Sequence, residues 1–144
     1  MQNGHTGTEF FTFADLCSPR HPITLFDIGG MTMKQITEQH MINAFGGESM
    51  ANMRYRHFAV QAEKEGFANV ARLFTAIAHA EYIHAGDHYR VLKHLNSGYI
   101  ADSMGAFGPG DSSKNLGLAI AGEKFEVEEM YPAYMKVAEM QGEK

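Results

Sequence analysis

Apolar residues recur about every 3.6 positions along three segments of the chain, which is the period of a helix with one buried face. The pattern predicts helices over about residues 33–65, 68–96 and 113–141. Gly66 follows the first segment and is a typical C-terminal stop. Residues 97–112 contain four glycines and a proline without this period, so we expect a loop there. Its length is typical of a crossover between two helical hairpins.

The start of the chain does not show the helical pattern. Residues 1–31 have no 3.6-residue period, and His21-Pro22 and Gly29-Gly30 would each interrupt a helix. We expect a poorly ordered N-terminal extension over residues 1–31 and one helical domain over residues 32–144. The predicted fold class is all-α. Pro132 lies inside the third predicted helix and is expected to kink it unless the freed carbonyl finds another partner.

Acidic residues interrupt the apolar face of each predicted helix. They are Glu48 in the first helix, Glu81 with His84 in the second, and Glu123 with Glu126 in the third. A carboxylate in a helical core is costly unless a partner compensates its charge. Residues three apart lie on the same helix face, and carboxylate and imidazole ligands suit divalent iron. Any one of these positions alone is a weak signal, but together they favour a bound metal pair.

The first and third helices share a weak internal repeat. Gly47-Glu48 and Tyr55 match Gly122-Glu123 and Tyr131, with an offset of 75 residues at the start and 76 at the end, so one residue is inserted. By the same spacing a second Glu-x-x-His would begin near position 157, beyond Lys144. We therefore expect the fourth helix of the bundle to be absent. The two tyrosines are interpreted as hydrogen-bond donors beside the metal, with simple core aromatics as the alternative.

Three stretches carry a resemblance to a known family. They are Gly-Glu-Ser-Met-Ala-Asn-Met-Arg-Tyr over 47–55, Ala-Glu-Tyr-Ile-His-Ala over 80–85, and Ile-Ala-Gly-Glu-Lys-Phe-Glu through Met-Tyr-Pro over 120–132. These residues resemble the rubrerythrins, the peroxide-reducing branch of the ferritin-like di-iron carboxylate proteins. The resemblance covers about residues 33–144. It implies a ferritin-like four-helix bundle fold, represented in this chain by three long helices, and a non-haem di-iron centre.

The resemblance also implies a role for each candidate ligand. Glu81 would bridge the two irons, Glu48 would be a terminal ligand of the first iron, and Glu123 a terminal ligand of the second. His84 and Glu126 would exchange at the first iron as its redox state changes. The fourth helix would supply the remaining ligands of the second iron, so we expect this chain alone to bind one metal better than two. A substituted metal is an alternative to iron.

The family implies reduction of hydrogen peroxide to water, in defence against oxidative stress, with electrons from a rubredoxin-type iron centre. Cys17 is the only cysteine, which excludes an internal disulfide and a rubredoxin centre in this chain. The electron donor would therefore be a separate chain. An apolar groove left where the fourth helix belongs invites self-association, so we expect a homodimer, including one that exchanges helices.

Two other functions stay open at the level of the sequence: a ferritin-like iron-binding ferroxidase, and a non-catalytic helical fragment that self-associates. Other classes are excluded by bulk properties. The net charge of −5 does not suggest a nucleic-acid partner. No apolar run reaches the roughly 18 residues of a membrane span. The start of the chain lacks the regions typical of a signal peptide, so a cytoplasmic protein is expected.

Overall fold

The computed structural model describes residues 35–92, 94–103 and 105–143, all within the compact unit Met31–Lys144. These residues form α2 (Gln35–Lys64), α3 (Ala68–Val91), α4 (Ser112–Phe125), the π-helical turn η1 (Glu126–Met130) and α5 (Tyr131–Met140). The last three follow one another directly and make the third long helical segment. No strand occurs in the described part of the chain, which confirms the all-α prediction. The predicted extension over residues 1–31 lies outside the described residues.

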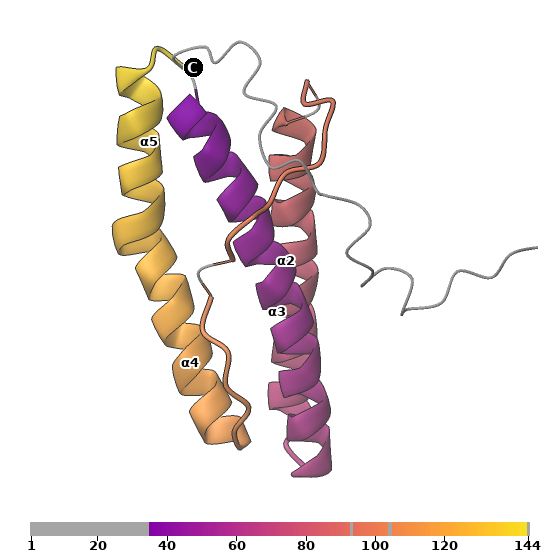
Figure 1. The fold of residues 1–144 in the computed structure, drawn as a ribbon. Coiled ribbons are helices and arrows are strands. Elements are labelled where there is room, and N and C mark those ends of the chain that lie inside the picture. The colour runs from indigo at the N-terminus through magenta and orange to yellow at the C-terminus, as the bar shows by residue number, and fades with distance from the viewer. Residues whose placement is uncertain (1–34, 93, 104, 144) are drawn as a thin grey trace, which may run out of the picture. The chain divides into compact units, whose positions relative to one another are not determined.

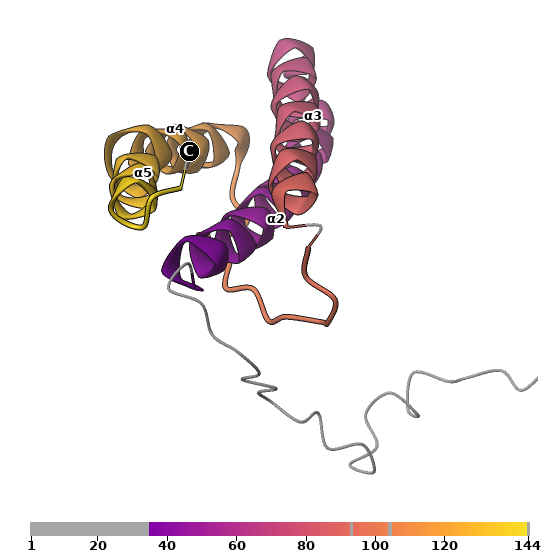
Figure 2. The same cartoon turned by 90° about the horizontal axis from the view of Figure 1, so that it is seen from above.

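α2 is the central helix of this unit (Figures 1 and 2). It lies between α3 and the segment α4–η1–α5, and it runs antiparallel to both. The chain reverses between α2 and α3 at Gly66, whose φ of +81° suits glycine because other residues lose energy there. α2 packs along its length against α3 and over shorter stretches against α4 and α5. Side chains from all three helical segments can therefore meet on one side of α2.

The apolar core lies where aromatic and small side chains of α2 and α3 meet. Tyr55 and Phe58 of α2 pack against Phe74 of α3, and the ring centroids of Phe58 and Phe74 are 5.3 Å apart. Alanines fill the space around these rings, namely Ala51, Ala59, Ala78 and Ala119. Because protein interiors are close-packed, such small residues let the helices approach closely. Tyr55 thereby belongs both to the core and to the set of residues expected at the site.

α3 ends earlier than the apolar pattern predicts. The helix stops at Val91 rather than near residue 96, and the N–H of Leu95 donates to the carbonyl of Leu92 (2.9 Å) in a turn. Val91 is exposed, so the apolar residues of the predicted last turn have little to pack against. Helical periodicity describes which face is apolar, but tertiary packing decides where a helix of this kind ends.

The third helical segment is interrupted by the π-helical turn η1. The segment begins with α4 after Asp111, whose carboxylate accepts the N–H of Lys114 (2.8 Å) as a helix cap. In η1 the N–H of Tyr131 donates to the carbonyl of Glu126, five residues earlier instead of four. Pro132 follows at once and has no N–H to donate. The predicted disturbance at Pro132 thus takes the form of a π turn directly before the proline.

The connection from α3 to α4 crosses α2 closely at two glycines. A Cβ atom at Gly46 would lie 3.0 Å from the Cβ of Ala101, and one at Gly47 would lie 3.2 Å from the carbonyl oxygen of Ser103. Both distances are shorter than most Cβ contacts, so a larger residue at either position would require the crossover to shift slightly, and glycine allows its close passage. The guanidinium of Arg54, two turns further along α2, donates to the carbonyl of Ala106 (2.7 Å). The crossover is therefore fixed directly beside Glu48.

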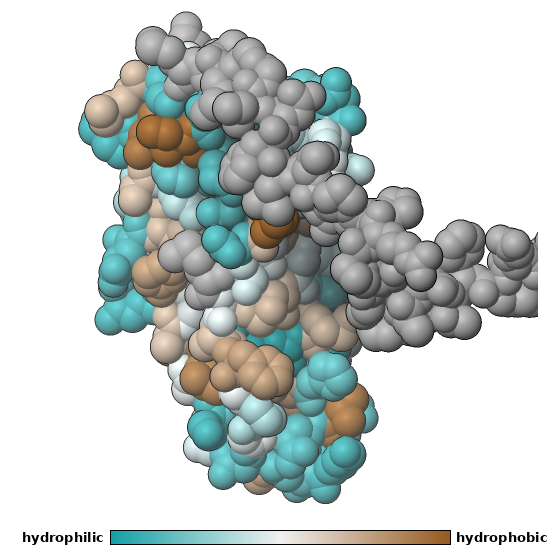
Figure 3. Space-filling view, viewed as in Figure 1, coloured by the Kyte–Doolittle hydropathy of each residue, from teal (hydrophilic) through white to brown (hydrophobic). Residues whose placement is uncertain are grey.

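Several apolar residues that the pattern predicts to face inward are exposed instead. Ile120 is 66% exposed and Val127 is 72% exposed, and no residue of η1 or α5 is fully buried. Figure 3 shows one face of the protein, on which apolar patches lie between hydrophilic residues. These side chains lie on a helical segment that α2 covers on one side only. Within the described residues, no helix has an apolar stretch long enough to cross a membrane.

Candidate metal centre

Two glutamates are buried at the interface of α2 and α3. Glu48 of α2 is 1% exposed and Glu81 of α3 is 2% exposed. His84 lies one turn after Glu81 on the same helix. One ligand atom from each of these three residues lies within 4.8 Å of the other two. This is the spacing at which carboxylate and imidazole groups can share a bound metal ion, since each bond to the metal is about 2.0–2.2 Å long.

The carboxylate of Glu48 is surrounded by hydrogen-bond donors from two other helices. Its Oε1 accepts the hydroxyl of Tyr131 and lies 3.8 Å from Nε2 of His88. Its Oε2 lies 3.8 Å from Nδ1 of His84 and has no hydrogen-bond partner. Burial alone would raise the pKa of Glu48, but the interactions with His88, Glu81 and Tyr131 lower the pKa to about 2. A buried acceptor without a partner is costly, and a cation would satisfy it.

Glu81 shows the opposite electrostatic behaviour. Burial and the neighbouring carboxylate of Glu48 raise the pKa of Glu81 to about 10, and the carboxylate of Glu123 adds to the effect. Nδ1 of His84 lies 3.0 Å from Oε2 of Glu81. Two adjacent buried carboxylates cannot both be ionised without a compensating positive charge. A divalent cation in place of the proton on Glu81 would remove this conflict, so the donor set fits a metal ion.

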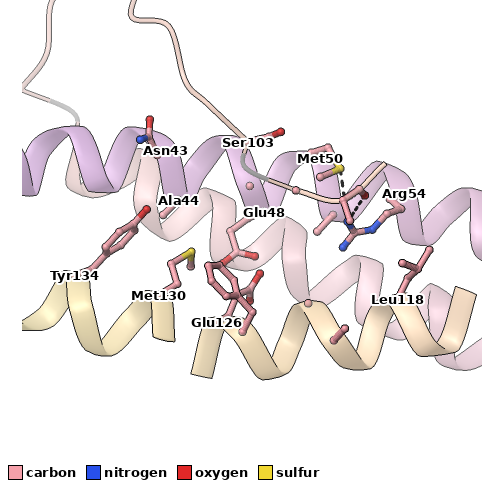
Figure 4. Close-up of a pocket in the computed structure, with 17 residues that line it drawn as sticks. Asn43, Ala44, Glu48, Met50, Arg54, Ser103, Leu118, Glu126, Met130 and Tyr134 are labelled. Carbon is pink, nitrogen blue, oxygen red and sulfur yellow. Dashed lines mark hydrogen bonds between the residues drawn. The ribbon is translucent and has the colours of Figure 1, made fainter. Parts of the chain in front are cut away.

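The third helical segment brings two more carboxylates to the same place. Glu123 of α4 accepts the hydroxyl of Tyr55 (2.8 Å). Burial, with the charges of Glu48 and Glu123, raises the pKa of Glu126 to about 7. Figure 4 shows the side chains of Glu48 and Glu126 directed toward one another from α2 and η1. The structure therefore brings ligand atoms of Glu48, Glu81 and His84 within 4.8 Å of one another, and places Glu123 and Glu126 near enough to interact electrostatically with the buried glutamates.

The structure places both predicted tyrosines against carboxylates of this cluster. Tyr55 contacts Glu123 and Tyr131 contacts Glu48, so related positions of the internal repeat make related hydrogen bonds. Burial raises the pKa of each tyrosine well above its ordinary value, and the carboxylate partner adds to the shift. Both phenols therefore keep their protons and act as donors. His84 differs from expectation in one respect, because its side chain is 53% exposed.

Two residues beside the cluster were not among the predicted site residues. The guanidinium of Arg54 lies 5.0 Å from the ring centroid of Tyr55 and 3.4 Å from its hydroxyl. Nε2 of His88 lies 3.3 Å from the hydroxyl of Tyr131. The position of His88 one turn after His84 is a signal in the sequence. The sequence contains no such signal for Arg54, since its position lies off the apolar face of α2.

Comparisons with known proteins match this arrangement. The rubrerythrin family model matches residues 41–144. The chain is 42% identical over 111 residues to rubrerythrin-2 of Clostridium acetobutylicum, and 38% identical over 109 residues to rubrerythrin of Nitratidesulfovibrio vulgaris. These alignments cover 76% and 74% of this chain and 59% and 55% of the relatives, so the chain spans little more than half of their length.

A solved structure gives the same result at the level of the fold. The structure of nigerythrin in a mixed-valence state matches with a TM-score of 0.65 and 33% sequence identity, over 74% of this chain and 52% of that chain. The family model, the sequence relatives and the solved structure thus agree on one family. The chain belongs to the rubrerythrin family.

Proposed function

We propose that this chain forms a non-haem di-iron centre that reduces hydrogen peroxide to water in defence against oxidative stress. The observation that carries the proposal is the buried cluster in which ligand atoms of Glu48, Glu81 and His84 lie within 4.8 Å of one another. The activity is the one that the family resemblance implies. A protein of the cytoplasm with this role needs no membrane segment, and none occurs among the described helices.

The five candidate ligands divide between two metal positions. Glu48, Glu81, His84 and Glu126 would hold the first iron, with His84 and Glu126 as alternative ligands. Glu123 and the second oxygen of Glu81 would hold part of the second. Iron bound there would supply electrons and Lewis acidity for cleavage of the peroxide O–O bond. This division predicts that the first position binds metal more tightly than the second.

The side chains around the metal positions would hold the ligands and manage protons. Tyr131 and Tyr55 donate to Glu48 and Glu123 and so fix the orientation of both carboxylates. The pKa of Glu126, raised to about 7 by burial and by its acidic neighbours, lets this carboxyl group hold or release a proton near neutral pH. Such a group suits a reaction in which two protons must reach the oxygens of the cleaved peroxide.

We further propose an electron donor with a rubredoxin-like centre on a separate chain, and a homodimeric assembly. The chain has a single cysteine, and a rubredoxin centre needs several. The apolar residues exposed on α4 and η1 support self-association, because contiguous apolar patches on soluble proteins commonly mark contact surfaces.

The first test is the number of irons bound per chain together with turnover of hydrogen peroxide. We expect iron to bind, and we expect Glu81→Gln to lose the metal pair, since Glu81 contacts both predicted positions. Glu63→Gln replaces an exposed glutamate of α2 and serves as the matched control. Peroxide turnover faster than turnover with dioxygen would distinguish a peroxidase from a ferroxidase. A folded protein that takes up no divalent metal, or a Glu81→Gln variant with normal activity, would contradict the proposal.

A further inference from the structure

A cavity of about 290 Å³ lies next to the metal candidates. It is lined by α2, the connection from α3 to α4, and the segment α4–η1–α5. Figure 4 shows Glu48 and Glu126 facing one another on one side of it, with Met130 beside them and Met50 and Leu118 further along. His84, which is exposed, does not line this cavity. The cluster of carboxylates therefore has one solvent-exposed side at His84 and a second side at the cavity.

The lining of the cavity is mainly apolar. Among the described residues, Glu48, Glu126 and Arg54 are the only charged side chains that line it. The apolar part includes Met50 and Met130 as well as Leu118 and Phe125. Pockets of this composition bind small molecules through apolar contact and orient them with a few polar groups. The lining therefore suits a molecule with an apolar body and one polar end, and the polar end belongs at Glu48 and Glu126.

The size of the cavity exceeds what hydrogen peroxide needs. Small-molecule sites are typically about 300–1,000 Å³, and a single water takes up about 30 Å³ in the liquid. Hydrogen peroxide has two oxygen atoms and no apolar group, so it would leave most of the cavity and all of its apolar lining unused. The cavity is thus matched to a substrate that carries a small organic group.

The wall of the cavity on the crossover side is held in place by Arg54. Nη1 of Arg54 donates to the carbonyl of Ala106 (2.7 Å) and lies 4.0 Å from Sδ of Met50. Its Nε is buried and has no hydrogen-bond partner. These contacts fix the side chain between α2 and the crossover, so that the cavity persists beside Glu48.

We propose that this cavity binds the organic group of an alkyl or aryl hydroperoxide and that the chain reduces such hydroperoxides to alcohols. The inference rests on the proposed function and specifies its substrate class. The reaction is ROOH plus two electrons and two protons, giving ROH and water. The O–O bond breaks, two O–H bonds form, and each oxygen is reduced by one electron. Iron bound at the carboxylate cluster would supply the two electrons, and the proposed rubredoxin-like donor would restore them.

Binding can be tested without turnover. The full chain is loaded with Zn(II), which is diamagnetic and redox-inert, and its methionine methyl groups are labelled with ¹³C. Addition of 2-phenyl-2-propanol, the product alcohol of cumene hydroperoxide, should shift the methyl signals of Met50 and Met130. The signals of Met135 and Met140, which are exposed and do not line the cavity, should stay in place. Absence of a shift at Met50 and Met130 would overturn the proposal.

A pair of neighbouring variants tests the same cavity by kinetics. Ala121 lines the cavity, whereas Ile120 is exposed and does not. In the iron-loaded chain, Ala121→Phe should lower kcat/KM for cumene hydroperoxide by about tenfold or more, because a blocked apolar pocket loses its contacts with the substrate. The value for hydrogen peroxide should fall less, because hydrogen peroxide has no organic group to place in the cavity. Ile120→Phe, the matched control, should leave both values unchanged.

The outcomes separate this inference from the function on which it rests. Turnover of hydrogen peroxide without turnover of cumene hydroperoxide would overturn the inference and leave the proposed function standing. Turnover of neither peroxide by the iron-loaded chain would overturn both. An equal loss for both substrates in Ala121→Phe would show that the cavity does not select the organic group, which also contradicts the inference.

Discussion

Glu48 has neighbours that an ordinary core residue does not have. An imidazole lies 3.8 Å from each of its two oxygens, and a phenol donates to one of them. These groups come from α3 and α5, so a single carboxylate of α2 is held by both other helical segments. A side chain in this position controls how the three segments meet, in addition to any metal that it binds.

Removal of the phenol that donates to Glu48 should weaken metal binding. In Tyr131→Phe the carboxylate of Glu48 keeps its place but loses a donor that orients it. Loss of such a partner typically weakens metal affinity by about 10–100-fold. Competition with a chelator of known affinity measures the change. Tyr89→Phe, which alters an exposed tyrosine of α3, should have no effect. Equal affinities for Tyr131→Phe and the unmodified chain would show that this hydrogen bond does not orient a ligand.

The protonation of Glu81 predicts how pH changes the stability of the metal-free chain. Its pKa is about 10 in the folded state and near the ordinary value of 4.5 in the unfolded state. Between these values the folded chain holds an additional proton, so the free energy of unfolding falls as pH rises. Glu48, with a pKa lowered to about 2, changes stability in the opposite sense, and only below its ordinary value.

Thermal unfolding in the presence of a chelator measures this dependence. We expect Tm to fall by several degrees between about pH 6 and about pH 9, because over this range Glu81 keeps its proton in the folded chain and has released it in the unfolded chain. Glu81→Gln, which cannot ionise, should flatten the slope. Added divalent metal should also flatten or reverse it, because the metal binds the ionised carboxylate. A Tm of the metal-free chain that rises over this range is the outcome that would refute the assignment.

The sequence predicted which residues could bind a metal better than it predicted how exposed their side chains are. A carboxylate on an apolar helix face has a high desolvation cost unless it has a partner. Glu48 and Glu81 could therefore be predicted as site residues from their spacing along the helices. The contact of Arg54 with Tyr55 could not, because a long side chain can reach a neighbour from a position off the apolar face. The exposure of His84 also has no signal in helical period, since it depends on what packs against α3.

At the scale of elements, η1 explains an irregularity of the internal repeat. The offset between α2 and the third helical segment is 75 residues at Glu123 and 76 at Tyr131. A π turn is an α-helix with one inserted residue, and η1 spans Glu126–Met130, between these two positions. The inserted residue is thus accommodated within η1. For this reason Tyr131 keeps a place beside the carboxylates, as Tyr55 does in α2.

The π turn should reduce the energetic cost of Pro132. A proline inside a regular helix costs about 3 kcal/mol because a hydrogen bond is lost and its ring clashes with the preceding turn. Directly after η1 the regular pattern is already interrupted, so Pro132→Ala should change the free energy of unfolding by only about 1 kcal/mol or less. Lys136→Pro, within α5, should cost about 3 kcal/mol or more. Urea unfolding measures both, and equal effects of the two substitutions would refute this interpretation.

The ends of the helices differ in how well the sequence predicts them. The bounds of α2 were close to the prediction because the apolar period and Gly66 agree. The end of α3 and the form of the disturbance at Pro132 were not predictable in the same way. The first depends on packing of Val91, and the second on how a backbone with one surplus residue and one missing N–H satisfies its carbonyls.

At the scale of the whole molecule, the proposed homodimer predicts a concentration-dependent mass. The paired substitutions Ile120→Lys and Val127→Lys place charge on an exposed apolar surface of α4 and η1. They should raise the dissociation constant of the dimer by about tenfold or more, because burial of unpaired charge is costly. Val60→Lys, on an exposed position of α2, is the matched control. Sedimentation equilibrium measures all three, and a monomer at every concentration would contradict the dimer.

The arrangement of the helical segments set the limit of prediction from sequence. The number of helices and their apolar faces follow from period, and the shared carboxylates indicate that the faces meet. The sequence pattern does not predict how completely the helices cover each other's apolar faces, because this depends on the distances between the helices and not on the pattern of any single helix. The exposure of Ile120 and Val127, predicted to be inward, is the consequence.

The close passage of the crossover over Gly46 and Gly47 has a consequence for how this protein can change over evolution. The two glycines directly precede Glu48, so the residues that allow the crossover to pass and a candidate metal ligand are consecutive in the sequence. A larger residue at either glycine would require the neighbouring Ala101 or Ser103 to give by a few tenths of an ångström. A change at these glycines is therefore expected to be accompanied by a compensating change in the crossover, next to a candidate metal ligand.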